Sequence, residues 1–246
     1  MSIDSATYTK LIQNVIERVS TGQADGVRRA ADLLAAAVRA GGVIQAFGCG
    51  HSEALAMEIA GRAGGLVPTS RIALRDLVLY GGEPLSTLAD PALELDPTIA
   101  RRLYELAPVK PDDAFILASN SGVNGAVVEM ALLVKERGHP LVAITSLEHS
   151  GRVEARHPSG RKLLDIADVV LDNGAPYGDA ALPLPSGGAV GAVSSITAAL
   201  LAQQLVIGIV NQLDDPPIYL SANVPGGREQ NAEVEARYAG RIRRTA

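Results

Sequence analysis

The sequence predicts an α/β fold built on a doubly wound parallel sheet, and three observations support this prediction. Short apolar runs alternate along the chain with longer segments whose apolar residues recur at helical spacing. The runs consist mainly of Ala, Val, Leu and Ile, which is typical of strands that are covered on both faces. Glycine-rich turns follow two of these runs, as expected where a strand leads into a helix.

Before the first strand, apolar residues at helical spacing predict two amphipathic helices that meet near Gly22. A helical hairpin outside an α/β unit needs a cover, and a partner subunit is a natural candidate. The strands are then predicted at residues 43–47, 66–68, 72–74, 114–118, 141–145 and 169–171. The later helices are predicted at 52–63, 97–106, 124–137 and 186–213, with a final helix after residue 227. Residues 76–95, which contain repeated Gly and Pro, are interpreted as irregular.

This element order predicts a single domain over residues 1–246. Its parts are an N-terminal helical hairpin at 1–40, an α/β core at 41–215, and a C-terminal loop and helix at 216–246. The basic tail at residues 237–244 is interpreted as a solvated helix face.

Composition excludes several classes of function. A formal net charge of −5 gives no electrostatic footprint for nucleic acid. The single cysteine, Cys49, cannot form an intramolecular disulfide, and no secretory signal pattern is present, so we expect a cytoplasmic protein. The longest apolar stretch contains Gln203 and Gln204 and falls short of about 20 apolar residues, so we expect a buried helix and no membrane partner.

Two Ser/Gly corners are the most informative features of the chain. The first, Gly48-Cys-Gly-His-Ser52, follows a predicted strand and opens a helix, and the second begins at Ser119. Such corners present free backbone N–H groups and the positive end of a helix dipole, which suit a phosphate group. Ligands bind doubly wound sheets at the carboxyl ends of the strands, where both corners lie. The pair therefore predicts a pocket for a phosphorylated small molecule.

The corners have two other interpretations, a dinucleotide-binding fingerprint and a turn or helix cap without a ligand. A dinucleotide fingerprint requires a third glycine at the position where Glu53 stands, and its carboxylate would meet the pyrophosphate. Either corner can also be a tight turn without a ligand, and Ser119, Asn120 and Ser121 can cap the helix that follows. Capping and phosphate binding use the same N–H geometry, so these two interpretations are compatible.

At these residues the chain resembles the sugar isomerase (SIS) domain family, over about residues 30–215. The first corner matches the family's GxGxS motif, and the second matches its Ser-x-Ser-Gly motif with a helical glutamate, Glu129, beyond it. A strand that ends in Thr145-Ser146 matches a third feature. Within the family the chain is most similar to a branch beside phosphoheptose isomerases and N-acetylmuramic acid 6-phosphate etherases.

The resemblance implies a flavodoxin-like, five-stranded parallel sheet and a homodimer or homotetramer. It also implies a sugar phosphate as ligand, which such proteins isomerise, cleave or bind as regulators, with no cofactor. Two potential metal ligands, Cys49 and His51, are too few to indicate a metal site. The residues implied in phosphosugar binding are Gly48, Gly50, Ser52, Ser119, Asn120, Ser121, Gly122, Asn124, Thr145 and Ser146.

Aldose–ketose isomerisation needs a general base that moves a proton between C1 and C2. The expected catalytic residues are Glu53, His51 and Glu83, although each has a structural alternative as a surface carboxylate, a structural histidine or an exposed loop residue. Glu58 has less weight because it lies five residues beyond Glu53. The isomerases and etherases of the family carry a functional glutamate ten residues after the motif serine, whereas this chain has Arg62.

We therefore expect a sugar-phosphate isomerase that works by proton transfer. Arg62 motivates a first alternative, a sensor that binds sugar phosphates without catalysis. A phosphosugar lyase or etherase is a second alternative, and a purely structural oligomer is a third. His149 and His157 are candidates for contacts with the substrate from the rim of the pocket, and Asp179 is a candidate to face it. The resemblance also implies a functional group from the C-terminal region, often of the neighbouring subunit, over the sugar, and Arg228 or Glu229 can supply it. His139 is expected to be structural.

Overall fold

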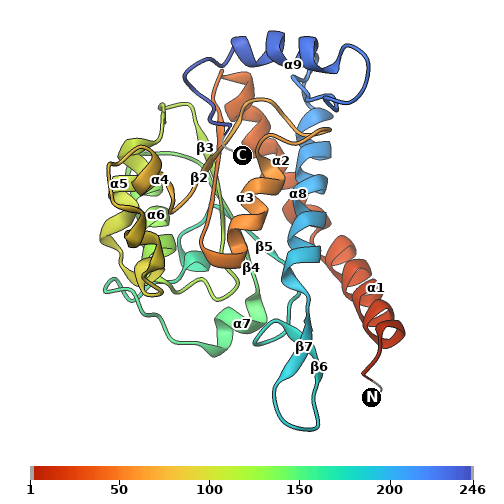
Figure 1. Ribbon diagram of the computed structural model, residues 1–246. Helices are drawn as coiled ribbons and strands as arrows, with labels where there is room; N and C mark the ends of the chain where they lie inside the picture. Colours follow the sequence, from red (N-terminus) through yellow and green to blue (C-terminus); the bar gives the residue numbers. More distant parts are fainter. Residues whose placement is uncertain (1–2, 245–246) are drawn as a thin grey trace.

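The computed structural model describes residues 3–244 and places a five-stranded parallel sheet between two layers of helices (Figure 1). The strand order is β2-β1-β3-β4-β5, which is the flavodoxin-like order. This confirms the predicted fold class. The strands are β1 (Ile44–Gly48), β2 (Thr69–Ile72), β3 (Ala114–Ala118), β4 (Leu141–Thr145) and β5 (Val169–Asp172).

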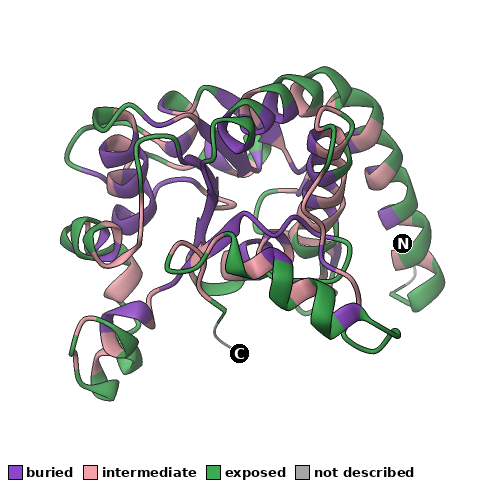
Figure 2. Ribbon diagram, turned by 90° about the horizontal axis from the view of Figure 1, so that it is seen from above, coloured by how far each residue is buried: buried purple, intermediate pink, exposed green. Residues whose placement is uncertain are grey.

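Each face of the sheet carries its own helical layer and hydrophobic core. The longer helices α1 (Ser5–Gly22), α2 (Ala24–Arg39) and α8 (Ser194–Val210) pack on one face together with α3 (Glu53–Ile59). The opposite face carries α4 (Asp76–Leu79), α5 (Thr98–Leu106) and α6 (Gly125–Glu136). Figure 2 shows the buried strands between these two layers. The remaining helices are α7 (Leu147–Arg152), after β4, and α9 (Gly227–Ala236), near the C-terminus.

The continuous apolar runs of the central strands follow from this double cover. Successive side chains of a strand point to opposite faces, so a strand between two helical layers must be apolar at every position. In β3, Ile116 faces one core while Phe115 and Leu117 face the other. The buried polar Gln45 of β1 donates from its Nε2 to Asp113 Oδ2 at 3.0 Å, whereas its Oε1 has no hydrogen-bond partner among residues 3–244.

A β-hairpin replaces the predicted start of the long helix at residues 186–213. Strands β6 (Ala180–Pro183) and β7 (Ala189–Ala192) pair antiparallel, and α8 begins only at Ser194. Gly187 and Gly188 both have positive φ, at 92° and 78°, which a turn between paired strands accepts and a helix does not. The apolar composition of the following helix had extended the prediction too far toward the N-terminus.

Several other boundaries also differ from the predictions. One strand, β2, replaces the two weak strands at 66–68 and 72–74, and α3 ends at Ile59 rather than at residue 63. The irregular segment 76–95 contains α4 and two 3-10 turns, Leu85–Ala89 and Leu93–Leu95. The basic tail is not a solvated helix face, because α9 ends at Ala236 and Arg241 pairs with the buried Asp113. Across residues 3–244, no helix combines the length and apolar character needed to cross a membrane.

Candidate functional site

The register of the sheet brings the two Ser/Gly corners together. Strands β1 and β3 are neighbours, and their last residues, Gly48 and Ala118, are paired. The corners therefore begin side by side at the carboxyl edge of the sheet. The first corner turns so tightly that a Cβ on Gly48 would lie 2.4 Å from the carbonyl oxygen of Ser52, so only glycine fits there.

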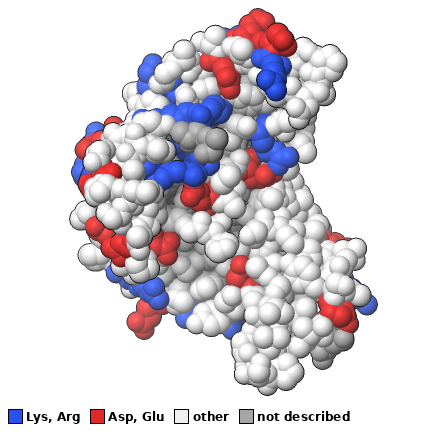
Figure 3. All heavy atoms as spheres, viewed as in Figure 1, with Lys and Arg blue, Asp and Glu red and all other residues white. Residues whose placement is uncertain are grey.

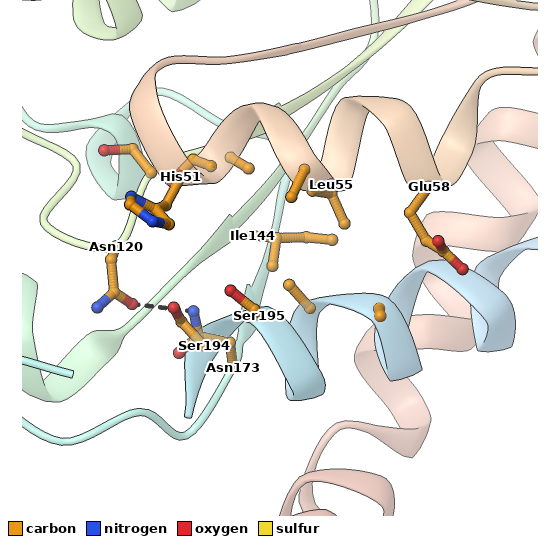
Figure 4. A pocket seen from close by; sticks show the side chains of 14 residues that line it. His51, Leu55, Glu58, Asn120, Ile144, Asn173, Ser194 and Ser195 are labelled. Carbon is orange, nitrogen blue, oxygen red and sulfur yellow. Dashed lines mark hydrogen bonds between the residues drawn. The ribbon is translucent and has the colours of Figure 1, made fainter. Parts of the chain in front are cut away.

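Two cavities meet at these corners and share four lining residues: His51, Ser52, Ser119 and Asn120. The corner cavity, of about 290 Å³, lies between the two Ser/Gly turns and is also lined by Gly50, Ser121 and Asn124. The helix cavity, of about 190 Å³, extends between α3 and α8 and is closed partly by Leu55, Ile144 and Ala198 (Figure 4). Together they form one candidate site with a polar end and a more apolar end.

The second corner is held by its own hydrogen bonds. Ser119 Oγ accepts from the backbone N–H of Gly122 at 3.1 Å, and Asn120 Oδ1 accepts from Asn173 Nδ2 at 3.0 Å. Helix α6 begins directly after this corner, and the side chain of its N-cap residue, Asn124, does not cap it. The first amides of a helix have no partner within the helix, so this end of α6 is suited to an anion.

Thr145 and Ser146 lie behind the second corner and do not line either cavity. Both are buried, and Thr145 Oγ1 donates to the backbone oxygen of Asn120 at 3.2 Å. Ser146 Oγ donates to the carbonyl of Ala175 at 2.6 Å and accepts from His149 N at 2.9 Å, which caps α7. The structure thus places both residues where they support the corner from the end of β4.

The three expected catalytic residues lie in different places. His51 lines both cavities and is exposed. Glu53 faces a third cavity of about 300 Å³, on the other side of Gly50, where it pairs with Arg75. Glu83 Oε1 pairs with Arg102 of α5 at 2.6 Å and lines none of these cavities. Of these three side chains, the structure brings only His51 to the corners.

Glu58 shares the helix cavity with His51, at its opposite end (Figure 4). Its Oε1 accepts from Gln203 Nε2 of α8 at 2.6 Å, and it also pairs with Arg62, which lies beyond the end of α3. The spacing 51, 55, 58 is that of one helix face over two turns, so this signal was present in the sequence. The spacing from Glu53 to Glu58 hides this relation, whereas the spacing from His51 to Glu58 reveals it.

A second histidine, His149, also reaches the corner cavity. Its Nδ1 is buried and has no hydrogen-bond partner among residues 3–244, and its ring lies 5.0 Å from that of Tyr177. The other two histidines discussed have structural contacts. The ring of buried His157 contacts Glu129 Oε2 at 3.0 Å, and that of His139 contacts the hydroxyl of Tyr104 at 2.7 Å.

Of the remaining candidate residues, Asp179 supports the wall of the helix cavity, whereas Arg228 and Glu229 line neither cavity. Asp179 caps α8: its Oδ1 accepts from the backbone N–H of Ser194 at 2.7 Å, and its Oδ2 accepts from that residue's hydroxyl at 2.8 Å. Ser194 lines the helix cavity, so Asp179 supports its wall. Arg228 and Glu229 lie at the start of α9 and line neither cavity of the site.

The free thiol of Cys49 is held in its neutral, weakly nucleophilic form. Burial raises its pKa to about 12, and the nearby carboxylates of Glu94 and Glu53 contribute in the same direction. Within the described residues, 3–244, no three His, Cys, Asp or Glu side chains are grouped so that they could hold a metal ion.

A parallel sheet with paired Ser/Gly corners at its carboxyl edge is the arrangement expected of a SIS domain, and comparison with known sequences agrees with this class. The profile of the SIS domain family matches residues 7–146, and the chain belongs to this family. Its relatives include the UPF0309 protein of Listeria monocytogenes, which is 37% identical over an alignment of 244 residues that covers 96% of this chain and 97% of the relative. The UPF0309 protein of Geobacillus kaustophilus is 36% identical over 243 residues, or 96% and 94% of the two chains.

Solved structures show the same fold at low sequence identity. A phosphoheptose isomerase from Francisella tularensis has a TM-score of 0.57 and 13% identity, with 83% of this chain and 95% of that chain covered. The phosphoheptose isomerase from Neisseria gonorrhoeae has a TM-score of 0.54 and 18% identity, with coverage of 84% and 96%. A putative phosphosugar isomerase from Bacteroides fragilis covers 94% and 97% at a TM-score of 0.53 and 17% identity.

Proposed function

We propose that this protein binds a sugar phosphate and isomerises it by proton transfer. One observation carries the proposal: the pairing of Gly48 with Ala118 places two Ser/Gly corners around one cavity, which continues into a second cavity along α3. The corner cavity offers hydroxyls, amides and the uncapped end of α6 to a phosphate group. The phosphate is anchored there by Ser52, Ser119 and Ser121, with Asn120 and Asn124 beside it.

The sugar then extends into the helix cavity. Helix rise gives about 9 Å along the chain from Ser52 to Glu58, which is on the scale of a sugar phosphate in extended form. His51 stands near the phosphate end and Glu58 at the far end. In this proposal the carboxylate of Glu58, at the far end, moves the C2 proton, and His51 exchanges protons with the sugar oxygens as acid or base. The remote phosphate contributes binding energy that positions the reacting carbons.

A sensor without catalysis is the second candidate. It is favoured by the ion pairs of Glu53 with Arg75 and of Glu83 with Arg102, which engage two of the three expected catalytic residues away from the corners. Cleavage by a lyase or etherase would begin with the same proton removal and differ only in the loss of a leaving group. We also propose a homodimer or homotetramer, with no nucleic acid as partner.

A thermal-shift panel tests the ligand class. It compares hexose, hexosamine and heptose phosphates with the same sugars unphosphorylated. A ligand at 100 times its Kd adds about 2.7 kcal/mol to the free energy of unfolding, which gives a visible shift. We expect a shift that requires both phosphate and sugar. The absence of a shift with every phosphate would mean that the corners only cap helices, and the proposal would be withdrawn.

Proton NMR in D₂O then separates the enzyme from the sensor, with the sugar phosphate that gives the largest shift. An isomerase exchanges the C2 proton of its substrate with solvent, whereas a sensor leaves that signal intact. A lyase or etherase releases a second product, which the same spectra detect.

The Ser121→Ala variant tests the anchor. Because Ser121 contacts the phosphate and not the reacting carbons in this proposal, KM should rise about tenfold while kcat changes less, a loss of roughly 1.4 kcal/mol of binding. An unchanged KM would remove Ser121 from the phosphate site. For a sensor, the same variant should raise Kd by a similar factor.

A further inference from the structure

We propose that Glu94 sets specificity at the corner cavity: its carboxylate opposes a bare phosphate ion and favours a phosphate ester whose sugar donates a hydroxyl group to it. This inference rests on the proposed function, since it assigns a role at the same site. Glu94 lies within residues 76–95, which the sequence pattern had indicated only as irregular.

The carboxylate of Glu94 connects the two Ser/Gly corners. Its Oε1 accepts a hydrogen bond from Asn124 Nδ2 at 3.0 Å, next to the second corner. Its Oε2 approaches the first corner closely, because a Cβ built on Gly50 would be 3.6 Å away from it. Glu94 accordingly lines the corner cavity and also the third cavity on the other side of Gly50.

The backbone around Glu94 is packed firmly against the fold. The carbonyl oxygen of Leu95 lies so close to the start of α6 that a Cβ on Gly125 would come within 2.1 Å of it. The side chain of Leu93 packs against the second core cluster, beneath the α5–α6 layer. These contacts on both sides hold the carboxylate at the mouth of the corner cavity.

The charge balance of the corner cavity makes this position consequential. Among the described residues that line it, Glu94 is the one acidic side chain, and none is Lys or Arg. Two negative groups a few ångströms apart repel each other strongly at a partly buried site. The amide of Asn124 is also a donor that a phosphate oxygen would use, and one of its two N–H groups already donates to Glu94. A free phosphate ion therefore meets both repulsion and competition.

A sugar phosphate meets the same carboxylate differently. Its hydroxyl groups donate hydrogen bonds, and an ionised carboxylate is an acceptor with several lone-pair sites. A hydroxyl near the ester oxygen that reaches Glu94 replaces part of the repulsion by a charge-assisted hydrogen bond. Glu94 thereby discriminates between a phosphate attached to a polyol and a phosphate alone.

Calorimetric titration of the wild type and Glu94→Gln at constant ionic strength tests this role. The probes are inorganic phosphate, glucose 6-phosphate, N-acetylglucosamine 6-phosphate and sedoheptulose 7-phosphate. We expect Glu94→Gln to bind inorganic phosphate at least tenfold more tightly and the esters with smaller gains or with losses. The ratio of ester affinity to phosphate affinity should therefore fall. Glu136→Gln, at the exposed far end of α6, removes the same charge and should leave every affinity unchanged.

Each outcome decides a different point. If esters bind the wild type and Ser121→Ala weakens them, but Glu94→Gln leaves the ratio unchanged, the specificity role is wrong and the phosphate site stands. An equal gain for phosphate and esters would reduce Glu94 to a general repulsive charge and overturn the hydroxyl contact. If no probe binds either the wild type or Glu94→Gln, the proposed function itself fails. Glu94→Ala, with its fold checked by circular dichroism, repeats the comparison should Glu94→Gln fold poorly.

Discussion

Cys49 shows how a single residue can look reactive in the sequence and be inert in the fold. It lies between two glycines in the first corner, next to His51, where a nucleophile would be well placed. In the structure Cys49 is partly buried, packs against the core cluster that includes Phe47 of β1 and lines the corner cavity. Burial raises its pKa, and the nearby carboxylates of Glu94 and Glu53 disfavour a thiolate further. A nucleophilic role for Cys49 therefore has no support from its surroundings.

This environment makes a measurable prediction. A pKa of about 12 leaves roughly one thiol in ten thousand as thiolate at pH 8, so the folded protein should react with a disulfide reagent far more slowly than a free cysteine does. The raised pKa keeps the thiol neutral, so the rate should rise with pH yet stay below that of a free cysteine wherever the protein remains folded. The rate in guanidinium chloride serves as the control, and fast labelling of the native protein would contradict the assigned burial.

At the scale of the element, the β6–β7 hairpin and α8 are joined by one carboxylate. Asp179, at φ 69°, is the non-glycine residue with positive φ among those described, and it stands directly before β6. Its carboxylate binds the first amide of α8, on the other side of the hairpin. The hairpin thus brings the chain back to Asp179, whose carboxylate caps the start of α8. This contact fixes Ser194 at the wall of the helix cavity.

The Asp179→Ala variant should therefore have two effects. Loss of the cap should cost about 1 kcal/mol of stability, which corresponds to roughly 2–4 °C in Tm for a chain of this length. Sugar-phosphate affinity should fall as well, because the wall that Ser194 forms loosens. Asp4→Ala is the matched control: Asp4 caps α1 through Thr7 N at 2.7 Å, away from the cavity, so it should lower Tm and leave affinity intact. Equal affinity losses in both variants would refute a local role for Asp179.

The elements that could be predicted are those whose sequence pattern is set by the double cover of the sheet. Strands β3 and β4 match their predicted bounds because every residue in them is buried. The hairpin was missed because its strands are only four residues long, and only Leu182 of β6 is buried. The short helix α7 has six residues, too few for a periodic signal.

Part of the candidate site could also be located from the sequence. The corners could be located because glycines and serines at strand ends are a local signal, and His51 came with them. Glu58 and Glu94 owe their places to tertiary packing: one meets Gln203 of α8, and the other reaches Asn124 from a segment without a periodic pattern.

At the scale of the whole molecule, one part of the face seen in Figure 3 carries few charged side chains. Figure 3 shows an uncharged expanse over α8 and the β6–β7 hairpin. It includes exposed apolar side chains, Ile207 at 60% and Ile196 at 38% exposure, on a helix that also carries the core residue Leu201. Helix α1 stands beside this surface and contacts α8, α2 and β6 (Figure 1). A second copy of the chain is the partner we expect for this surface.

The Ile207→Glu variant tests that association. A glutamate buried at a subunit interface costs on the order of a few kcal/mol, and symmetry applies the cost to each copy, so the molar mass by light scattering should fall to that of a smaller species. Leu79→Glu, on the opposite helical layer and 52% exposed, should leave the mass unchanged. A wild type that is already monomeric would exclude this role for the surface.

Glu94 reaches the corners from a segment outside the sheet, which has a consequence for how such a site can diversify. The proposed phosphate anchor depends on strand register, since Gly48 and Ala118 must stay paired for the corners to meet. Residues 85–96 form no part of that ladder and pack on α6 from outside. A segment that is replaced or lengthened there would change which molecules are admitted without disturbing what holds their phosphate. Grafting this segment between relatives is therefore a route to exchange ligand preference while the two corners remain the same.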